Sequence, residues 1–266
     1  SAKIKIISIL LLIVAIIGLV TTYIVNDSIR EFIDTKVLKK EISDDSVKNI
    51  YTNSSVIQTM TLAKNIVTLS SGELKVYDFE GNAKNTIKMK IGNPIYDVED
   101  KYLGIADKNV TKIYLIEDDK LVWEKTLDVT VEKIEVNKNG YMAVVTKDSV
   151  YKSVVLVYSN KGELLLKSYV SNGYVIDTEI SPDNKYLVIG EVDYSKTYIE
   201  STVKVIDIQK AIKSEEGSVV NTFVKDKLLV NLKIKENLSI IGQYSDSVVN
   251  IGYNKNENKE IYKLSN

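Results

Sequence analysis

The sequence contains no cysteine and no histidine, and Arg30 is the only arginine among 35 basic residues. Without cysteine or histidine the chain cannot form disulfides, a thiolate nucleophile or a Ser-His or Cys-His pair, and nearly all zinc, copper, haem and iron-sulfur sites are excluded. A single arginine leaves almost no bidentate forks for phosphate or carboxylate. The formal charge of −1 implies no broad attraction to nucleic acid.

Glycine is also scarce, with 12 copies, and residues such as Gly72, Gly140 and Gly162 stand singly where hairpins are expected. Glycine-rich phosphate loops are therefore absent. What remains is an ordinary folding composition, because 44% of the 266 residues are hydrophobic and 27% are charged.

The amino terminus holds a run of 20 uncharged residues from Ile6 to Val25. As a helix rising about 1.5 Å per residue, this run is about 30 Å long, which matches a bilayer core. Lys3 and Lys5 precede the run and acidic residues follow it, which predicts a cytoplasmic tail over 1–5, a transmembrane helix over 6–25 and an extracytoplasmic remainder. A cleaved signal peptide is the alternative, but the run is long for one and no A-x-A site follows. A buried core helix would normally have a polar face.

Ser28 and Glu31 have the spacing of a capping box, and apolar residues recur at helical intervals up to Ile42. This pattern predicts a helical stalk or linker over 26–46. The polar residues 43–46 form a break, after which we place a single soluble domain over 47–266.

Beyond residue 47, short runs of Val, Ile, Tyr and Thr alternate with turn residues, which indicates an all-β structure. Five segments can be superposed, each as strand, hairpin, strand and polar turn. They are residues 64–82, 101–120, 140–163, 185–210 and 237–258. Tyr77, Tyr114, Tyr158 and Ile206 hold equivalent places in the second of those strands.

Further apolar stretches flank each segment, such as 131–136 and 175–180 before and 121–127 and 164–170 after. Four strands per unit at a period near 40 residues is typical of β-propeller blades. Two stacked sandwiches would share the strand density but not the register of the turns. The sequence therefore predicts an all-β propeller of about five four-stranded blades.

The segments DKYLGIAD, VWEKTL, NGYMAVVTKDSVYKSVVLVYSNKGELL and GYVIDTEISPDNKYLVI resemble blades of an uncharacterised family of single-span, membrane-anchored proteins from clostridia-type Gram-positive bacteria (DUF5711-like). That family is similar in turn to quinoprotein-like and WD40-like propellers. The resemblance covers about residues 1–266 and implies architecture rather than chemistry. The cofactor-holding residues of quinone-dependent enzymes find no match here, and Trp123 is the only tryptophan. The resemblance is to non-catalytic scaffolds.

Five blades are few for a scaffold of this type. The chain lacks an initiator methionine, which is consistent with truncation from a larger ring. An open ring would expose an unpaired edge near 263–266.

Without histidine, acid-base chemistry would need paired carboxylates or a lysine or tyrosine with a shifted pKa. The acidic clusters fall in expected turns, no EF-hand spacing is present, and solvated turns explain them. The clusters are Asp44 with Asp45, Glu99 with Asp100, Glu117 with Asp118 and Asp119, and Glu215 with Glu216. We expect no catalytic residue, no cofactor and no metal site.

Tyrosine is in surplus, with 17 copies against three phenylalanines. Most tyrosines on strands are half-buried β formers. Tyr151, Tyr174, Tyr194 and Tyr198, however, fall in or beside connections expected on one propeller face, and tyrosine is a common interface anchor. We predict these four as partner-binding residues, with the hairpin 192–205 as the first place to look.

The sequence therefore indicates a membrane-anchored, extracytoplasmic propeller that acts as a non-catalytic binding scaffold for another envelope protein. One alternative is a carboxylate-dependent enzyme acting on glycans or peptidoglycan, which requires two acids converging in the central channel. Another is a receptor for a small ligand or ion, which requires a deep polar funnel. The partner's identity and the oligomeric state are not encoded in any motif.

Overall fold

The computed structural model describes residues 2–26, 29–30, 33–38, 50, 55–108, 111–235, 239–251 and 258–263. The chain divides into two compact units, Ser1–Ile50 and Tyr51–Asn266.

The first unit contains the helix α1 (Ala2–Val25), so the helix expected over 6–25 is present. In its last turns, the hydroxyls of Thr21 and Thr22 donate to backbone carbonyls four residues earlier. Over the described part of the chain, however, no helix meets the length and apolarity that crossing a membrane requires. Of the stalk predicted over 26–46, the described residues are 26, 29–30 and 33–38, of which 29–30 are helical and Ile33–Val37 form one π-helical turn, η1. Residues 27–28, 31–32 and 39–46, including the break at 43–46, lie outside the described residues.

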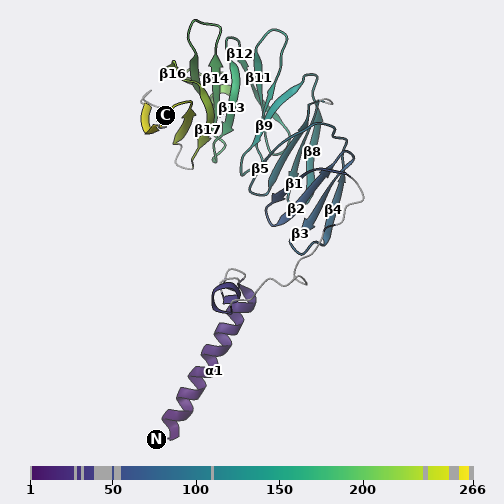
Figure 1. Cartoon of the computed structure of the whole chain (residues 1–266), viewed down its shortest axis with the longest axis vertical. Helices are drawn as coiled ribbons and strands as arrows, with labels where there is room; N and C mark the ends of the chain where they lie inside the picture. Colours follow the sequence, from purple (N-terminus) through teal and green to yellow (C-terminus); the bar gives the residue numbers. More distant parts are fainter. Residues whose placement is uncertain are drawn as a thin grey trace. The chain divides into compact units, whose positions relative to one another are not determined.

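The described residues of the second unit form five antiparallel sheets, each of four strands that pair in chain order (Figure 1). This confirms the prediction of about five four-stranded units. The first sheet holds β1 (Val56–Leu62), β2 (Asn65–Ser70), β3 (Glu73–Asp78) and β4 (Ala83–Lys88); the second β5 (Pro94–Glu99), β6 (Tyr102–Asp107), β7 (Lys112–Glu117) and β8 (Lys120–Thr126); the third β9 (Val131–Val136), β10 (Met142–Thr146), β11 (Ser153–Tyr158) and β12 (Leu164–Val170); the fourth β13 (Tyr174–Ile180), β14 (Tyr186–Asp193), β15 (Glu200–Asp207) and β16 (Val219–Lys225); and the fifth β17 (Leu229–Ile234), β18 (Ile240–Tyr244), β19 (Ser247–Ile251) and β20 (Asn258–Lys263).

A short helix, α3 (Ile208–Ile212), lies in the connection between β15 and β16 of the fourth sheet. The side chain of Asp207 caps it by accepting a hydrogen bond of 3.0 Å from the backbone N–H of Lys210.

The core consists of apolar clusters, each formed between two sheets that follow one another in the chain. Leu69 of the first sheet shares a cluster with Leu103 of the second, and Val188 of the fourth shares one with Leu232 of the fifth. The other two clusters join the second sheet to the third and the third to the fourth. In the described residues no such cluster joins the fifth sheet to the first. The middle strands are consequently buried on both faces, as stacked blades require.

Two glycines permit this close stacking. A Cβ atom on Gly104 would lie 2.6 Å from a methyl group of Val136 in the next sheet, and a Cβ on Gly190 would collide with Leu229 in the same way. Both glycines occupy the second strand of their sheet, where the first strand of the following sheet approaches.

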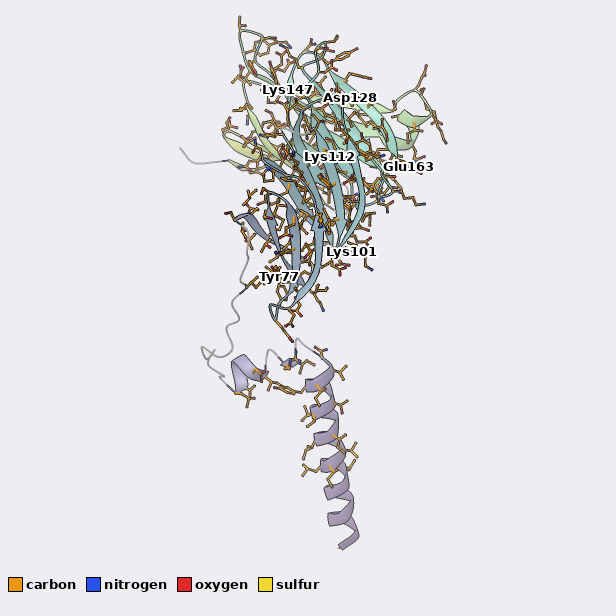
Figure 2. The ribbon with its side chains drawn as sticks, turned by 90° about the vertical axis from the view of Figure 1, so that its right-hand side faces the viewer. Tyr77, Lys101, Lys112, Asp128, Lys147 and Glu163 are labelled. Atoms are coloured by element: carbon orange, nitrogen blue, oxygen red, sulfur yellow. The ribbon has the colours of Figure 1, made fainter. Side chains whose placement is uncertain are left out.

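The side chains that the repeat placed in equivalent positions all lie in third strands and are buried. Tyr77, Tyr114 and Tyr158 are at most 6% exposed, and Ile206 is buried like them. Figure 2 shows Tyr77 on the first sheet and Lys101 in the turn between β5 and β6 of the second. Lys101 forms an ion pair of 2.5 Å with Glu117, so part of the acidic cluster 117–119 is paired rather than freely solvated.

Candidate functional site

Two of the four predicted tyrosines stack against each other. Tyr174 begins β13, and Tyr194 directly follows β14. Their rings are parallel to within 3° and their centroids are 5.1 Å apart. Tyr194 is 61% exposed and Tyr174 36%. The hydrogen bond from Tyr194, with the nearby charge of Lys152, lowers the pKa of Tyr174, and the same bond raises the pKa of Tyr194.

Tyr151, the third predicted residue, lies in the adjoining hairpin of the third sheet. Asp148 folds this hairpin by accepting hydrogen bonds from the backbone N–H groups of Val150 and Tyr151. These bonds hold the pKa of Asp148 below its usual value. The ring of Tyr151 contacts that of Tyr169, with 4.6 Å between the two ring centroids. Tyr169 was not among the residues predicted from the sequence.

Lys152 connects the two tyrosine pairs, because it follows Tyr151 in the chain and its ammonium lies 5.4 Å from the centre of the Tyr174 ring. Val150, at the tip of the same hairpin, is 81% exposed. We call this surface the tyrosine patch; its residues are Val150, Tyr151, Lys152, Tyr169, Tyr174 and Tyr194. Tyr198, the fourth predicted residue, lies instead over Lys196, 5.8 Å from the ammonium.

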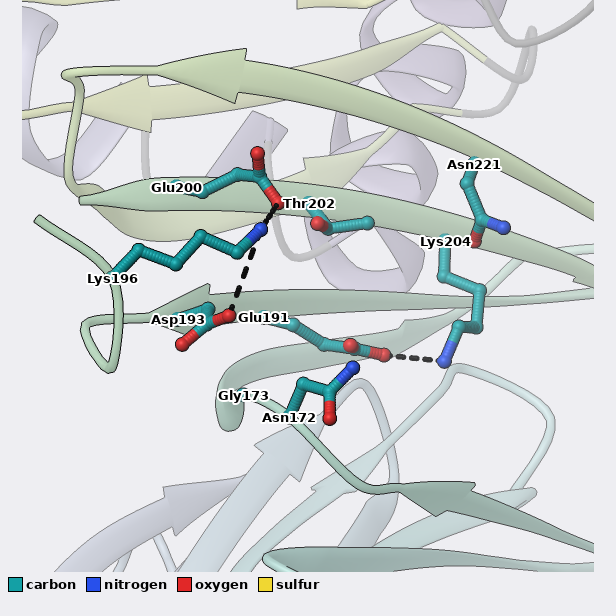
Figure 3. A pocket seen from close by; sticks show the side chains of 9 residues that line it. All are labelled: Asn172, Gly173, Glu191, Asp193, Lys196, Glu200, Thr202, Lys204 and Asn221. Atoms are coloured by element: carbon teal, nitrogen blue, oxygen red, sulfur yellow. Dashed lines mark hydrogen bonds and ion pairs between the residues drawn. The ribbon is translucent and has the colours of Figure 1, made fainter. Parts of the chain in front are cut away.

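The patch stands beside a small polar pocket of about 200 Å³ between the turn at Asn172 and strands β14 and β15 (Figure 3). Its charged side chains are largely paired within the pocket. Glu191 pairs with Lys204 at 2.6 Å, and Lys196 pairs with Glu200 at 2.6 Å. The third acid, Asp193, accepts hydrogen bonds from the N–H and hydroxyl of Ser195 and lies 3.8 Å from Lys196, so these contacts hold the hairpin 193–200 in place.

A second group of polar side chains lies on the first strands of the sheets. We call it the inner-strand cluster, and it consists of Asp97 on β5, Lys133 and Glu135 on β9, Asp177 and Glu179 on β13, and Lys233 on β17. Lys133 donates to Asp177 at 2.6 Å and Lys233 pairs with Glu179 at 2.9 Å, so the contacts cross from sheet to sheet.

Two aspartates of the cluster bind backbone groups of the following sheet. Asp97 accepts a hydrogen bond of 2.7 Å from the N–H of Val136, and Asp177 accepts one of 2.7 Å from the N–H of Leu232. Asp177 also accepts from the N–H of Thr178 and is almost fully buried. These bonds give both aspartates a structural role.

The two glutamates of the cluster, Glu135 and Glu179, have fewer partners to offset the cost of burying their charge. Burial raises the pKa of Glu135 to about 8, with the nearby charge of Asp97 acting in the same direction. The ammonium of Lys133, 3.1 Å from the Glu135 carboxylate, lowers the pKa of Glu135, but it lies closer, at 2.6 Å, to the carboxylate of Asp177. Burial likewise raises the pKa of Glu179 to about 7 although Lys233 faces it. Burial therefore favours the protonated form of Glu135 more than in an exposed glutamate.

Carboxyl groups of three sheets thus come within electrostatic reach of one another, an arrangement that we did not predict from the sequence. The acidic clusters named above fall in expected turns, whereas these acids lie inside strands. A signal was present, because polar residues recur two positions apart in the first strands as DVE, KIE, DTE and NLK. Among the described residues, no three acidic side chains converge as a metal ion would require.

The family model described as "Family of unknown function (DUF5711)" matches residues 37–265. The chain belongs to this family. No curated protein matches the chain. Membership confirms the family, DUF5711, that the blade motifs indicated, over residues 37–265, and it assigns no activity.

Solved structures similar to this DUF5711 chain include β-propeller and WD40 domains. The β-propeller domain of Cps50 (Swd1) from Myceliophteria thermophila has a TM-score of 0.55 at 12% identity, covering 83% of this chain and 75% of that one. Hsv2 from Kluyveromyces lactis has 0.53 at 13%, covering 86% and 77%. The WD40 domain of Pan2 from Neurospora crassa has 0.53 at 12%, covering 79% and 65%, so the chain spans slightly less than two thirds of that domain. At these identities the likeness shows the fold alone.

Proposed function

We propose that the protein is a non-catalytic scaffold that binds another protein of the bacterial cell envelope through the tyrosine patch. The observation that carries this proposal is the stacked, solvent-exposed pair of Tyr174 and Tyr194, 5.1 Å apart, beside the Tyr151–Tyr169 pair.

Exposed aromatic rings that are already ordered suit an interface. Tyrosine offers a large apolar area and a hydrogen-bonding tip, and it loses little rotamer entropy on binding. Here stacking restricts Tyr174 and Tyr194 before a partner arrives, and the paired charges of Glu191, Lys204, Lys196 and Glu200 hold the supporting hairpin. Preorganisation of this kind lowers the cost of association.

The test is crosslinking in intact cells, followed by identification of proteins that copurify with the full chain. Tyr194→Ala should abolish copurification of the main partner without lowering the melting temperature, because the ring is exposed. Tyr186→Ala is unsuitable as a control because Tyr186 packs against a core cluster; the exposed Phe79→Ala on the first sheet is the matched variant and should retain the partner. A partner that remains bound to Tyr194→Ala would contradict the proposal.

The location is a second part of the proposal. We infer that residues 6–25 attach the protein to the cell membrane as a single pass with the propeller outside. The support comes from the sequence alone, with 20 uncharged residues preceded by Lys3 and Lys5 and followed by acids, because no helix of the described residues meets the criterion for crossing a membrane.

Carbonate extraction and protease treatment of intact cells test this inference. The full chain should remain in the membrane pellet and its propeller should be cleaved from outside. Ile13→Lys combined with Ile16→Lys should move the protein to the soluble fraction. Cleavage only after cell lysis would contradict the extracytoplasmic orientation.

The inner-strand cluster supports a second candidate function, a carboxylate-dependent hydrolase acting on glycans. A glutamate whose protonated form is favoured by burial, as that of Glu135 is, has the environment of a general acid, and Asp97 lies close enough to raise its pKa. The structural bonds of Asp97 and Asp177 make this the weaker candidate. Release of reducing ends from peptidoglycan by the wild type, lost in Glu135→Gln, would favour it over the scaffold.

A further inference from the structure

β12, the outermost strand of the third sheet, has one edge without a strand partner. It pairs with β11 along its length, and no other described strand pairs with it. Outer strands usually carry charges that discourage further pairing. β4 holds two lysines and β8 holds three charged residues, whereas β12, with the sequence LLLKSYV, holds only Lys167. Its leucines make it the least protected of these three edges.

Grooves lie along both faces of this strand. The first, of about 330 Å³, is bounded by the end of the second sheet, including Leu127 and Asp128, and by Leu156 and Leu164 of the third. Asp128 lies at the same end of the sheets as Lys147 (Figure 2). The second groove, of about 480 Å³, runs between β12 and α3, with Leu166, Ile206, Ala211, Ile212 and Val219 among its walls. Tyr169 and Lys167 border both grooves.

The charge at the centre of the strand is not neutralised within the described part of the chain. Lys167 is exposed and forms no ion pair with any described residue. By contrast, Lys204, which borders the second groove, is held by Glu191. An incoming segment would therefore meet one available positive charge, midway along an otherwise uncharged edge.

We propose that the free edge of β12 is the docking site for an extended segment of a partner protein, which adds to the third sheet as a fifth strand. Its alternate apolar side chains enter the two grooves, and an acidic side chain binds Lys167. Main-chain hydrogen bonds supply affinity and the grooves on the two faces supply specificity, because successive side chains of a strand point to opposite faces. The inference rests on the proposed function only in taking the partner to be a protein, since it does not depend on Tyr174 or Tyr194.

A second copy of the chain fits this edge less well than a foreign segment does. If the β12 strands of two copies paired antiparallel along their full length, Leu164 would face Val170 and Lys167 would face Lys167. Like charges directly opposite one another are destabilising. The charge therefore favours an acidic partner over self-association.

The experiment is selection from a phage library of random 12-residue peptides against the purified chain. We expect enriched peptides with apolar residues at alternate positions and a central Asp or Glu. A synthetic peptide of the consensus should bind Lys167→Glu about tenfold or more weakly than wild type. A second selection against Lys167→Glu should enrich a central Lys or Arg instead. Peptides N-methylated at every second residue along the pairing edge should not bind.

Matched variants distinguish peptide binding at β12 from binding elsewhere on the chain. Lys161→Glu reverses an exposed lysine in the preceding turn and should leave the peptide affinity unchanged. Tyr194→Ala should also leave it unchanged, so loss of the scaffold partner and loss of the peptide are distinguishable. Unchanged circular dichroism and melting temperature confirm that Lys167→Glu folds. The proposal is overturned if no peptide is enriched, if Lys167→Glu binds the consensus peptide as tightly as wild type does, or if sedimentation shows that β12 pairs two copies.

Discussion

The carboxylate of Asp177 in β13 accepts a hydrogen bond of 2.7 Å from the backbone N–H of Leu232 in β17, although the two residues belong to different sheets. Asp97 and Val136 repeat this relationship between the second and third sheets. The first strand of a sheet has one edge without a ladder partner, and a buried N–H on that edge would be costly if left unpaired. The aspartates therefore fasten β9 to β5 and β17 to β13.

Removal of the Asp177 side chain should strongly destabilise the folded protein. Asp177→Ala leaves the buried N–H of Leu232 without an acceptor and removes the nearer of the two carboxylates that face Lys133, so we expect the free energy of unfolding to fall by about 3 kcal/mol. Urea unfolding followed by fluorescence measures this loss. Glu216→Ala, at an exposed turn, is the control and should change stability by less than about 0.5 kcal/mol. Equal effects of the two substitutions would refute the fastening role.

Glu135 should give the protein an unusual dependence of stability on pH. The unfolded chain releases this proton near the ordinary glutamate value, 4.5, whereas the folded protein holds it up to about 8. Between these values the folded state binds more protons, so the contribution of Glu135 to stability decreases as pH rises through that window. Glu135→Gln should flatten the profile from pH 5 to 8 and be more stable than wild type at pH 9. Urea titrations of both proteins across this range measure the effect, and Glu216→Gln is the control. The idea is wrong if the pH profile of Glu135→Gln is the same as that of the wild type.

Gly104 is expected to tolerate no side chain. Gly104→Ala places a methyl group against Val136, Met142 and Ile134, and overpacking of this kind typically costs about 1–3 kcal/mol. Gly72→Ala is the matched control, because a methyl group at that position would have nothing within 4 Å and the change should be close to neutral. Thermal unfolding of both variants tests the contrast, and a neutral Gly104→Ala would mean that the second and third sheets can separate at little cost.

The ion pair between Glu191 and Lys204 should be coupled more strongly than an exposed one. Both side chains are mostly buried and 2.6 Å apart, whereas Lys112 and Glu124 are more exposed and 3.7 Å apart. A double-mutant cycle with Glu191→Gln and Lys204→Met should give about 1 kcal/mol, and the cycle on the exposed pair about half of that or less. Coupling energies in the reverse order would contradict this assignment.

The fold could be predicted from the sequence because propeller blades repeat locally. The stretch 131–136 coincides with β9 and 164–170 with β12, since period-two apolar runs bounded by turns leave little ambiguity. The site was predictable only in part. Tyr174 and Tyr194 were chosen for their place in connections, and their stacking depends on the register of β13 with β14.

The inner-strand cluster was missed for a physical reason. The local pattern marks Asp97 and Asp177 only as polar positions in their strands, whereas their partners Val136 and Leu232 lie 39 and 55 residues further along the chain. No local pattern reveals that a backbone N–H of the next blade needs an acceptor. Tyr169 was missed because on an outer strand it looks like any half-buried β former, and only the approach of Tyr151 distinguishes it.

Each apolar cluster joins only two sheets that follow one another in the chain, so the sheets form a linear series of contacts rather than one shared core. In the described residues, the third sheet is supported from both sides, while the first and fifth each share a core with one neighbour only. Local unfolding should therefore begin at the first and fifth sheets and spread from there to the second, fourth and third. Amide protons of β10 and β11 should be the last to exchange with deuterated solvent.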